Sequence, residues 1–386
     1  MSPTHSIGQS STRVEGEIKV TGRAVYALDV TVPGMLWAKI LRSPLPYARI
    51  KQIDVTESLR QPGVRAIITA TDVYGRRIGR RIYDMPILAE EVVRFVGEKV
   101  AAVAAETESI AEEALSLIRV NYEPLVPLLD PVESLKPSAI LLHPDVLSYK
   151  GLPQPINSAS NVFVTVTTAK GNIEEGFREA DVIVENVFET QPVHQSYLEP
   201  HSCVVRVAES GAAEIWACSK VPFALREQVA TAVGVARDKL VMHPCYIGGD
   251  FGGKGDFMDV PIAYFLSQKS RRAVKIVMDY DEELAAGDPR HGAIIKVKTG
   301  VKKDGVIVAH HMDFIFDSGA YGAFKPRGFL PGTPESAGPY RMANVLIEEK
   351  CVYTNKIPCG HMRAPGDAQG FFANESQMDL VAKKPT

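Results

Sequence analysis

A proline-rich stretch between residues 131 and 160 most constrains how this chain can fold. Prolines recur through it at positions 131, 137, 144, 153 and 155, with serines between them. Because proline fixes φ and lacks a backbone N–H donor, such a stretch cannot sustain a helix or an inner strand. It therefore predicts a linker that wraps over a surface between two domains. We place the domains at residues 1–135 and 161–386, with the linker at 136–160.

The region before the linker alternates strand and helix signals. Short apolar or β-branched runs predict strands at residues 35–41, 64–69 and 100–105. The residues Ser109-Ile110-Ala111-Glu112 have capping-box spacing, and apolar residues follow them at helical spacing. We therefore expect a helix capped by Ser109, followed by a strand at residues 119–122.

The region after the linker is richer in strands and hairpins. The patterns predict strands at residues 162–168 and 182–190, a short helix at 173–180, a helix at 223–233 ended by Gly234, and hairpins that pair 203–207 with 214–217 and 294–301 with 306–316. The second hairpin turns at Asp304-Gly305, a strong turn signal. The fold class is therefore mixed α+β, although these signals do not determine the topology.

Charge and cysteine usage exclude several classes of protein. The 43 Lys plus Arg against 46 Asp plus Glu leave no broad basic field, which argues against nucleic-acid and anionic-membrane binding. The five cysteines are scattered and form no C-x-x-C pair, so the usual iron–sulfur and zinc-ribbon spacings are absent. The polar N-terminus lacks a signal-peptide core, and no stretch approaches the roughly 20 apolar residues of a membrane span. We therefore expect a cytoplasmic protein.

The glycine-rich loop Gly248–Lys254 is the most informative local motif. It follows an apolar stretch and precedes a predicted helix capped by Asp259, with Pro261 in its first turn. Closely spaced glycines let backbone N–H groups approach an anion, and the helix start adds a positive dipole end. A tight structural turn explains the glycines about equally well.

Two nucleotide-binding interpretations of this loop are disfavoured by its sequence. The run fits the first seven positions of a phosphate loop, but Gly255 replaces the Ser or Thr that holds Mg²⁺. A dinucleotide fingerprint does not fit. We therefore do not expect a nucleoside triphosphatase.

The segment from Gln191 to Cys203 contains His194, Glu199 and His201. Its spacing is not that of a helical zinc site, so we expect a buried Glu–His hydrogen-bond network that positions a loop. A pair of adjacent histidines, 310 and 311, falls on a predicted strand, so their rings should point to opposite faces.

Taken in order, several segments resemble the molybdenum-binding part of the xanthine dehydrogenase and aldehyde oxidase family. Lys19-Val20-Thr21-Gly22-Arg23-Ala24, Arg42-Ser43-Pro44 and Val96-Gly97-Glu98 resemble its a/b hammerhead domain. Leu198-Glu199-Pro200-His201 and the Gly248–Lys254 loop resemble its first molybdopterin domain, as does the loop around Arg363. The resemblance covers essentially the whole chain. It implies a hammerhead domain followed by a molybdopterin-binding domain.

The resemblance also implies a function. The chain would bind molybdenum on molybdopterin, in the plain or cytosine dinucleotide form, and serve a hydroxylase that oxidises an electron-poor carbon with water-derived oxygen. The substrate would be a small heterocycle, aldehyde or aromatic compound. The metal would lie near Phe251 and Arg363 with no direct protein ligand. The cofactor-binding residues it implies are Gly249, Asp250, Phe251, Gly252, Gly253, Arg363 and Ala364.

This sequence departs from the family's pattern at three positions. Lys220 stands where a Gln usually donates to the metal's oxo group, so we expect Lys220 to contact that ligand or a substrate anion. Pro365 replaces an aromatic residue that packs on a flat substrate, and Gly255 replaces the carboxylate of purine oxidisers. A purine substrate is therefore not expected. Arg327 is a further candidate for substrate contact.

The resemblance finally implies partners. The general base of the family is a Glu in a second molybdopterin domain, expected here on another chain, and the 2Fe-2S clusters and FAD would lie on further subunits. The alternative is a non-catalytic or degenerate fragment that binds pterin or protein without turnover.

Overall fold

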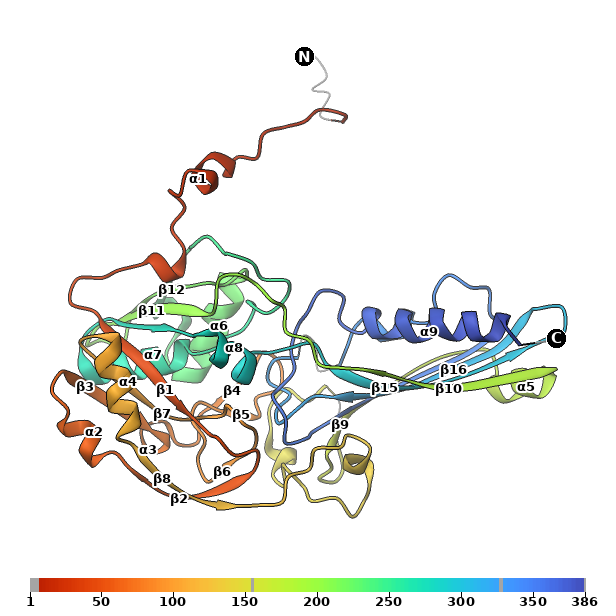
Figure 1. The fold of residues 1–386 in the computed structure, drawn as a ribbon, viewed down its shortest axis with the longest axis horizontal. Helices are drawn as coiled ribbons and strands as arrows, with labels where there is room; N and C mark the ends of the chain where they lie inside the picture. The colour runs from red at the N-terminus through yellow and green to blue at the C-terminus, as the bar shows by residue number, and fades with distance from the viewer. Residues whose placement is uncertain (1–6, 154–155, 326–328, 385–386) are drawn as a thin grey trace.

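The structure is a computed structural model that describes residues 7–153, 156–325 and 329–384. It consists of a broad body and a long five-stranded sheet that projects from it (Figure 1). Helices and strands are interspersed throughout the chain, so the predicted α+β class is confirmed. Helix α1 (Gly16–Val20) stands away from the body on an extended N-terminal arm (Figure 1).

A seven-stranded sheet forms the centre of the body, and its strands come from both sides of the proline-rich stretch. In spatial order they are β13 (Leu240–His243), β12 (Ala213–Ala217), β11 (Ser202–Val207), β14 (Val274–Val277), β1 (Leu36–Arg42), β7 (Lys99–Ala105) and β3 (Val64–Thr69). Strand β1 lies between β14, which is parallel to it, and β7, which is antiparallel. The two halves of the sequence therefore meet inside one sheet.

Helices cover both faces of this sheet. The main core packs α6 (Pro222–Val233) and α7 (Val260–Ser270) on one face, and α4 (Glu108–Ser116) covers the other face at β7 and β1. Strand β7 is buried along its whole length because Ala102 and Ala104 face one core and Ala101 and Val103 the other. Short helices complete the body: α2 (Thr56–Arg60), α3 (Ala70–Val73) and α8 (Tyr280–Ala286).

Two small sheets and the proline-rich stretch extend the body. The three-stranded sheet consists of β6 (Val92–Val93), β2 (Ala48–Asp54) and β8 (Arg119–Pro124), and a two-stranded ribbon consists of β4 (Arg77–Ile78) and β5 (Met85–Pro86). Among its described residues, the proline-rich stretch forms two 3₁₀ turns, at Glu133–Leu135 and Val146–Ser148, and an isolated β-bridge between Lys150 and Tyr83. It does not simply lie over a surface, because Leu142, His143 and Val146 are buried.

The projecting sheet is built from long strands. In spatial order they are β10 (Val182–Thr190), β15 (Gly292–Val301), β16 (Ile307–Asp317), β17 (Asn344–Val352) and β9 (Val162–Lys170). Helix α9 (Asp367–Ala382) lies along it, and α5 (Ile173–Glu179) packs at its far end (Figure 1). The predicted turn at Asp304-Gly305 is confirmed, with Gly305 at φ +87°. His310 is buried against Thr299 while His311 pairs with Glu348, so the two rings face opposite sides as predicted.

Some helix ends differ from the sequence patterns. Helix α6 ends at the left-handed Gly234 as predicted. Helix α4, however, is capped by Thr107, whose hydroxyl accepts from the N–H of Ile110, so the cap predicted at Ser109 is wrong. Asp259 occupies the N-cap position of α7, but its side chain accepts from buried Lys99 (3.1 Å) instead of capping the helix.

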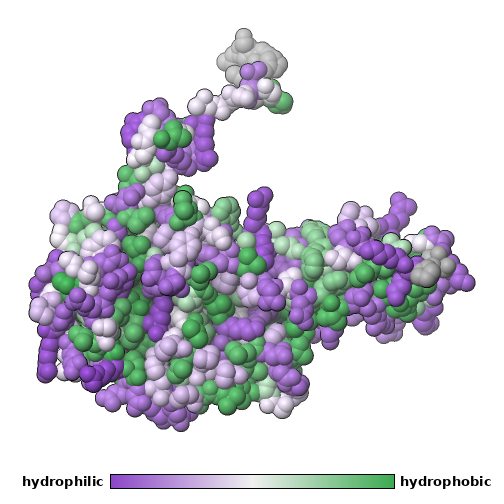
Figure 2. Space-filling model, in the orientation of Figure 1, coloured by the Kyte–Doolittle hydropathy of each residue, from purple (hydrophilic) through white to green (hydrophobic). Residues whose placement is uncertain are grey.

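The surface and helix lengths bear on membrane association. Figure 2 shows hydrophilic and hydrophobic residues interspersed over the body, with hydrophilic residues gathered at the tip of the projecting sheet. Within the described ranges, no helix combines the length and the apolar character that a bilayer span requires.

Candidate cofactor-binding site

The glycine-rich loop adopts a backbone that only glycine tolerates at two positions. Gly249 and Gly252 have φ of +105° and +122°. A Cβ added at Gly252 would lie 2.6 Å from the carbonyl oxygen of His361, and one at Gly249 would lie 2.8 Å from Cβ of Tyr197. Between them, Phe251 also has a positive φ, +46°, and its side chain is half exposed. The loop is thus held in a strained shape that presents Phe251 at the surface.

The loop around Arg363, which we call the arginine loop, lies directly against the glycine-rich loop. The N–H of Arg363 donates to the carbonyl oxygen of Phe251 at 2.7 Å. From the side, the guanidinium of Arg290 donates to the carbonyl oxygens of Arg363 (2.6 Å) and Ala364 (3.1 Å). Ala364 has φ +60°, and both Arg363 and Ala364 are exposed. The carbonyl oxygens of Arg363 and Ala364 therefore accept hydrogen bonds from another side chain of this protein.

The two loops together present unused backbone donors. Among the described residues, no hydrogen bond uses the N–H groups of Phe251, Gly252 or Ala364. Asp250, by contrast, closes the loop, since its carbonyl accepts from the N–H of Gly253 (2.9 Å) and its carboxylate from the N–H of Lys254 (2.8 Å). Adjacent free N–H groups in positive-φ turns suit an oxygen-rich anionic group such as a phosphorylated pterin. The residues present therefore fit the cofactor that the sequence implies.

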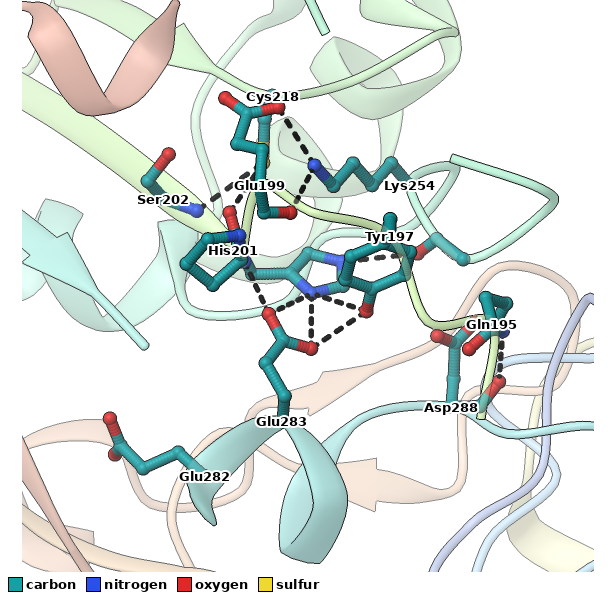
Figure 3. A network of polar contacts seen from close by, with 12 residues as sticks. Gln195, Tyr197, Glu199, His201, Ser202, Cys218, Lys254, Glu282, Glu283 and Asp288 are labelled. Carbon is teal, nitrogen blue, oxygen red and sulfur yellow. Dashed lines mark hydrogen bonds and ion pairs between the residues drawn. The ribbon is translucent and has the colours of Figure 1, made fainter. Parts of the chain in front are cut away.

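Lys254 lies beneath the loop and does not point toward this surface. Its ammonium donates to Oε2 (2.8 Å) and the backbone carbonyl (2.6 Å) of Glu199, and both side chains are buried (Figure 3). The N–H of Gly248 donates to the same carboxylate oxygen at 2.7 Å. A phosphate loop needs its lysine free to reach a phosphate, so this geometry agrees with the rejection of that interpretation. At the start of α7, Asp259 is buried and its carboxylate accepts from Lys99.

Within the segment 191–203, His201 forms a buried hydrogen-bond network, but with a different carboxylate from the one expected. Nδ1 of His201 lies 3.0 Å from both carboxylate oxygens of Glu283 on α8, and the hydroxyl of Tyr197 donates to Glu283 at 2.7 Å (Figure 3). Burial opposes ionisation of Glu283, but His201, the hydroxyl of Tyr197 and the nearby ring of His194 (3.6 Å) hold its pKa well below its usual value. Glu199 pairs with Lys254 instead. Nowhere in the described ranges do three His, Cys, Asp or Glu side chains gather as a metal site.

Two buried carboxyl groups lie next to the two loops. Asp256 follows the glycine-rich loop, Asp288 packs against Gly360 beside the arginine loop, and both are buried. Burial raises the pKa of Asp256 to about 6 and raises that of Asp288, which the charge of Asp256 raises further. Burial therefore favours the protonated form of both carboxyl groups.

The residues predicted to contact substrate lie in different surroundings, and one of them is not described by the structure. The ammonium of Lys220 lies 3.0 Å from the carboxylate of Asp250, at the edge of the glycine-rich loop. Gly255 is buried, and Pro365 contributes its carbonyl to the N–H of Gly332 at 3.0 Å. Arg327 lies outside the described residues.

Arg80 is a site residue that the sequence patterns missed. It lies between the short strands β4 and β5, where no motif marks it, yet its guanidinium reaches the arginine loop and donates to Nδ1 of His361 at 2.9 Å. The available signal was the concentration of basic residues around it, in the adjacent arginine pairs at positions 76–77 and 80–81.

Two family models match the chain. The model described as "Aldehyde oxidase and xanthine dehydrogenase, a/b hammerhead domain" matches residues 21–126. The model described as "Molybdopterin cofactor-binding domain" matches residues 155–385 and includes both site loops.

Curated relatives and solved structures agree with these matches. The chain is 35% identical to a probable xanthine dehydrogenase subunit of Bacillus subtilis, over 97% of this chain and 48% of that protein. It is 29% identical to the nicotinate dehydrogenase large molybdopterin subunit of Eubacterium barkeri, over 98% of this chain and 86% of that relative. The CO dehydrogenase of Oligotropha carboxidovorans superposes with TM-score 0.89 at 27% identity, over 97% of this chain and 48% of that one. The chain therefore spans less than half the length of the Bacillus and Oligotropha relatives, but most of the length of the Eubacterium relative.

Proposed function

The chain belongs to the aldehyde oxidase and xanthine dehydrogenase family of molybdopterin-binding proteins, and we propose that it forms the cofactor-binding face of a molybdenum hydroxylase. The reaction would oxidise an electron-poor carbon of a small heterocycle, aldehyde or aromatic compound, with oxygen derived from water. The observation that carries this proposal is the 2.7 Å hydrogen bond from the N–H of Arg363 to the carbonyl of Phe251. It joins the two loops that the sequence assigns to the cofactor.

The site loops would bind and orient the cofactor. When bound, the molybdenum–pterin group supplies the redox centre of the reaction. The free N–H groups of Phe251, Gly252 and Ala364 would donate to its oxygen atoms, and Arg290 would keep the arginine loop in place. Gly249, Asp250 and Gly253 would maintain the loop's shape. We propose that the metal lies near Phe251 and Arg363 without a protein ligand.

Lys220 would supply a charged donor at the edge of the site. Its side chain is one-third exposed and is held by Asp250, so its ammonium has a fixed position. We propose that it contacts an oxygen of the cofactor or an anionic group of the substrate. A lysine reaches farther than a glutamine and carries a full charge.

Further chains or segments would complete the enzyme. Relatives are named as a xanthine dehydrogenase subunit, a large molybdopterin subunit and a large chain, which are parts of multichain proteins. We propose that a second molybdopterin domain supplies the general-base Glu and that 2Fe-2S and FAD subunits carry electrons away. The cytosine dinucleotide form of the cofactor is part of the same proposal.

Purification of the native assembly tests this function. The chain would be isolated by affinity tag from its own host, and molybdenum, pterin and released cytidine monophosphate would be measured per chain. We expect stoichiometric molybdenum and pterin, co-purifying chains, and reduction of an artificial dye with an aldehyde or N-heterocycle. Pterin without dye reduction would favour a non-catalytic binding fragment. A preparation without molybdenum and pterin would contradict both.

A further inference from the structure

Two cationic side chains from distant segments converge over Gly255. A Cβ added at Gly255 would lie 3.1 Å from Nη1 of Arg80 and 3.4 Å from Cε of Lys220. The glycine is buried beneath them, while the side chains of Arg80 and Lys220 are 21% and 32% exposed. The space that a side chain at position 255 would occupy is therefore filled by two positive groups. A group that binds at this part of the site would therefore meet hydrogen-bond donors and positive charge.

The guanidinium of Arg80 is held in place, but not all of its N–H donors have a partner among the described residues. It donates to Nδ1 of His361 at 2.9 Å and lies 3.9 Å from the carboxylate of Asp256. Both contacts use Nη1, so within the described ranges the Nε–Nη2 edge makes none. That edge is the side-on fork with which arginine binds a carboxylate through two parallel hydrogen bonds.

The surrounding groups leave this fork positively charged. Burial and the charge of Arg80 lower the pKa of His361 to about 4, so its ring is neutral at pH 7 and accepts from Arg80. The carboxylate of Asp250 is engaged by Lys220 through both oxygens, at 3.0 and 3.1 Å. Asp256 approaches Arg80 only through Nη1, at a distance longer than a hydrogen bond.

We infer that Arg80 is a specificity residue that binds a carboxylate group of the substrate, with the ammonium of Lys220 beside it. The inference rests on the proposed function and adds to it the class of substrate, a small electron-poor ring or aldehyde that carries a carboxylate. A neutral compound of the same shape would leave the Arg80 fork unpaired when water is excluded, and this penalty discriminates against it.

Equilibrium binding of two matched probes to the native assembly tests the inference without turnover. The probes are pyridine-3-carboxylate and pyridine-3-carboxamide, which share a ring and differ in charge. Dissociation constants would be measured by anaerobic calorimetry for the wild type, Arg80→Met and Arg80→Lys. Arg81→Met is the matched control, because Arg81 is the adjacent, exposed arginine. Molybdenum and pterin would be measured on every sample, and thermal unfolding would verify that each variant is folded.

We expect the wild type to bind the carboxylate at least about tenfold more tightly than the carboxamide. Arg80→Met should abolish this preference, Arg80→Lys should retain part of it, and Arg81→Met should retain all of it. A molybdenum-containing wild type without the preference, or Arg80→Met with the preference intact, would overturn the role of Arg80 alone. A wild type without molybdenum and pterin would overturn the proposed function and this inference with it.

Discussion

The ammonium of Lys254 and the carboxylate of Glu199 form a buried ion pair of 2.8 Å beneath the glycine-rich loop. The carboxylate also accepts from the N–H of Gly248 at the start of the loop. Because Lys254 ends the same loop, one carboxylate fixes both of its ends. The shape of the loop therefore depends on an ion pair that is buried beneath it.

Replacing Lys254 with Met should destabilise the protein strongly. The substitution leaves the Glu199 carboxylate buried without its cation, which costs about 3–5 kcal/mol in comparable buried pairs. Denaturant unfolding would measure this loss. The double variant Lys254→Met/Glu199→Gln should recover part of it, since no uncompensated charge remains. Lys51→Met, in an exposed pair with Glu123, is the control and should change stability by less than about 1 kcal/mol. A loss at Lys254 no larger than at Lys51 would refute the structural role.

Substitution of Gly252 with Ala should distort the site more than an ordinary loop substitution. The new Cβ would meet the carbonyl of His361 at 2.6 Å, in a backbone conformation that L residues rarely adopt. We expect a loss of stability of about 1–3 kcal/mol or more, together with loss of bound pterin. Gly305→Ala is the matched control, because Gly305 also has a positive φ but open space around it. If both variants lose the same stability and keep pterin, the close contact at His361 has no consequence.

Lys220→Gln should separate catalysis from stability. Its ion pair with Asp250 is partly exposed, so its loss should change the unfolding free energy by no more than about 1 kcal/mol. Turnover or substrate affinity should nevertheless fall by about tenfold or more if Lys220 contacts the cofactor or substrate. Steady-state kinetics with dye reduction would measure both constants, with Lys51→Gln as the control. Unchanged kcat and KM would remove Lys220 from the site.

The Asp256–Asp288 pair should make stability fall as pH rises. Burial raises the pKa of both carboxyl groups above the usual 3.8, to about 6 for Asp256. Since the protonated forms are favoured in the fold, their stabilising contribution is complete below about pH 4. It is lost as pH rises through about 6.

Asp288→Asn tests this dependence, because the amide cannot ionise. Thermal unfolding between pH 4 and 8 should show a smaller decline than in the wild type. The facing groups Arg80, His201, Lys220 and Glu283 remain in both proteins, and Glu283 contributes in the opposite direction at lower pH. Exposed Asp379→Asn should leave the profile unchanged. Identical profiles for the wild type and Asp288→Asn would exclude a raised pKa.

Local elements could be predicted well from the sequence because local chemistry determines them. The Asp304-Gly305 turn and the end of α6 at Gly234 depend on a few adjacent residues with special backbone preferences. The cap of α4 was misplaced by two residues because Thr107 and Ser109 carry the same hydroxyl.

The loops of the site could be predicted from the sequence, but the buried contacts that hold them in place could not. Glycine spacing marks the loop at Gly248–Lys254, and the family pattern marks Arg363. Nothing local indicates that Lys254 turns inward to Glu199 or that His201 finds its carboxylate on α8. Arg80 was missed for the same reason, since its position near Gly255 exists only after the two halves of the chain have packed.

The pairing of β1 with β14 inside the central sheet has a consequence for biosynthesis. Strand β1 emerges from the ribosome well before its parallel neighbour β14, which is complete only once Val277 has been translated. At about 5–20 residues per second, one edge of β1 therefore waits for roughly ten seconds or more without its partner. An unpaired strand edge invites pairing with other chains. Nascent protein is thus exposed to aggregation during this interval, and its yield should depend on translation speed and on chaperones that shield β1.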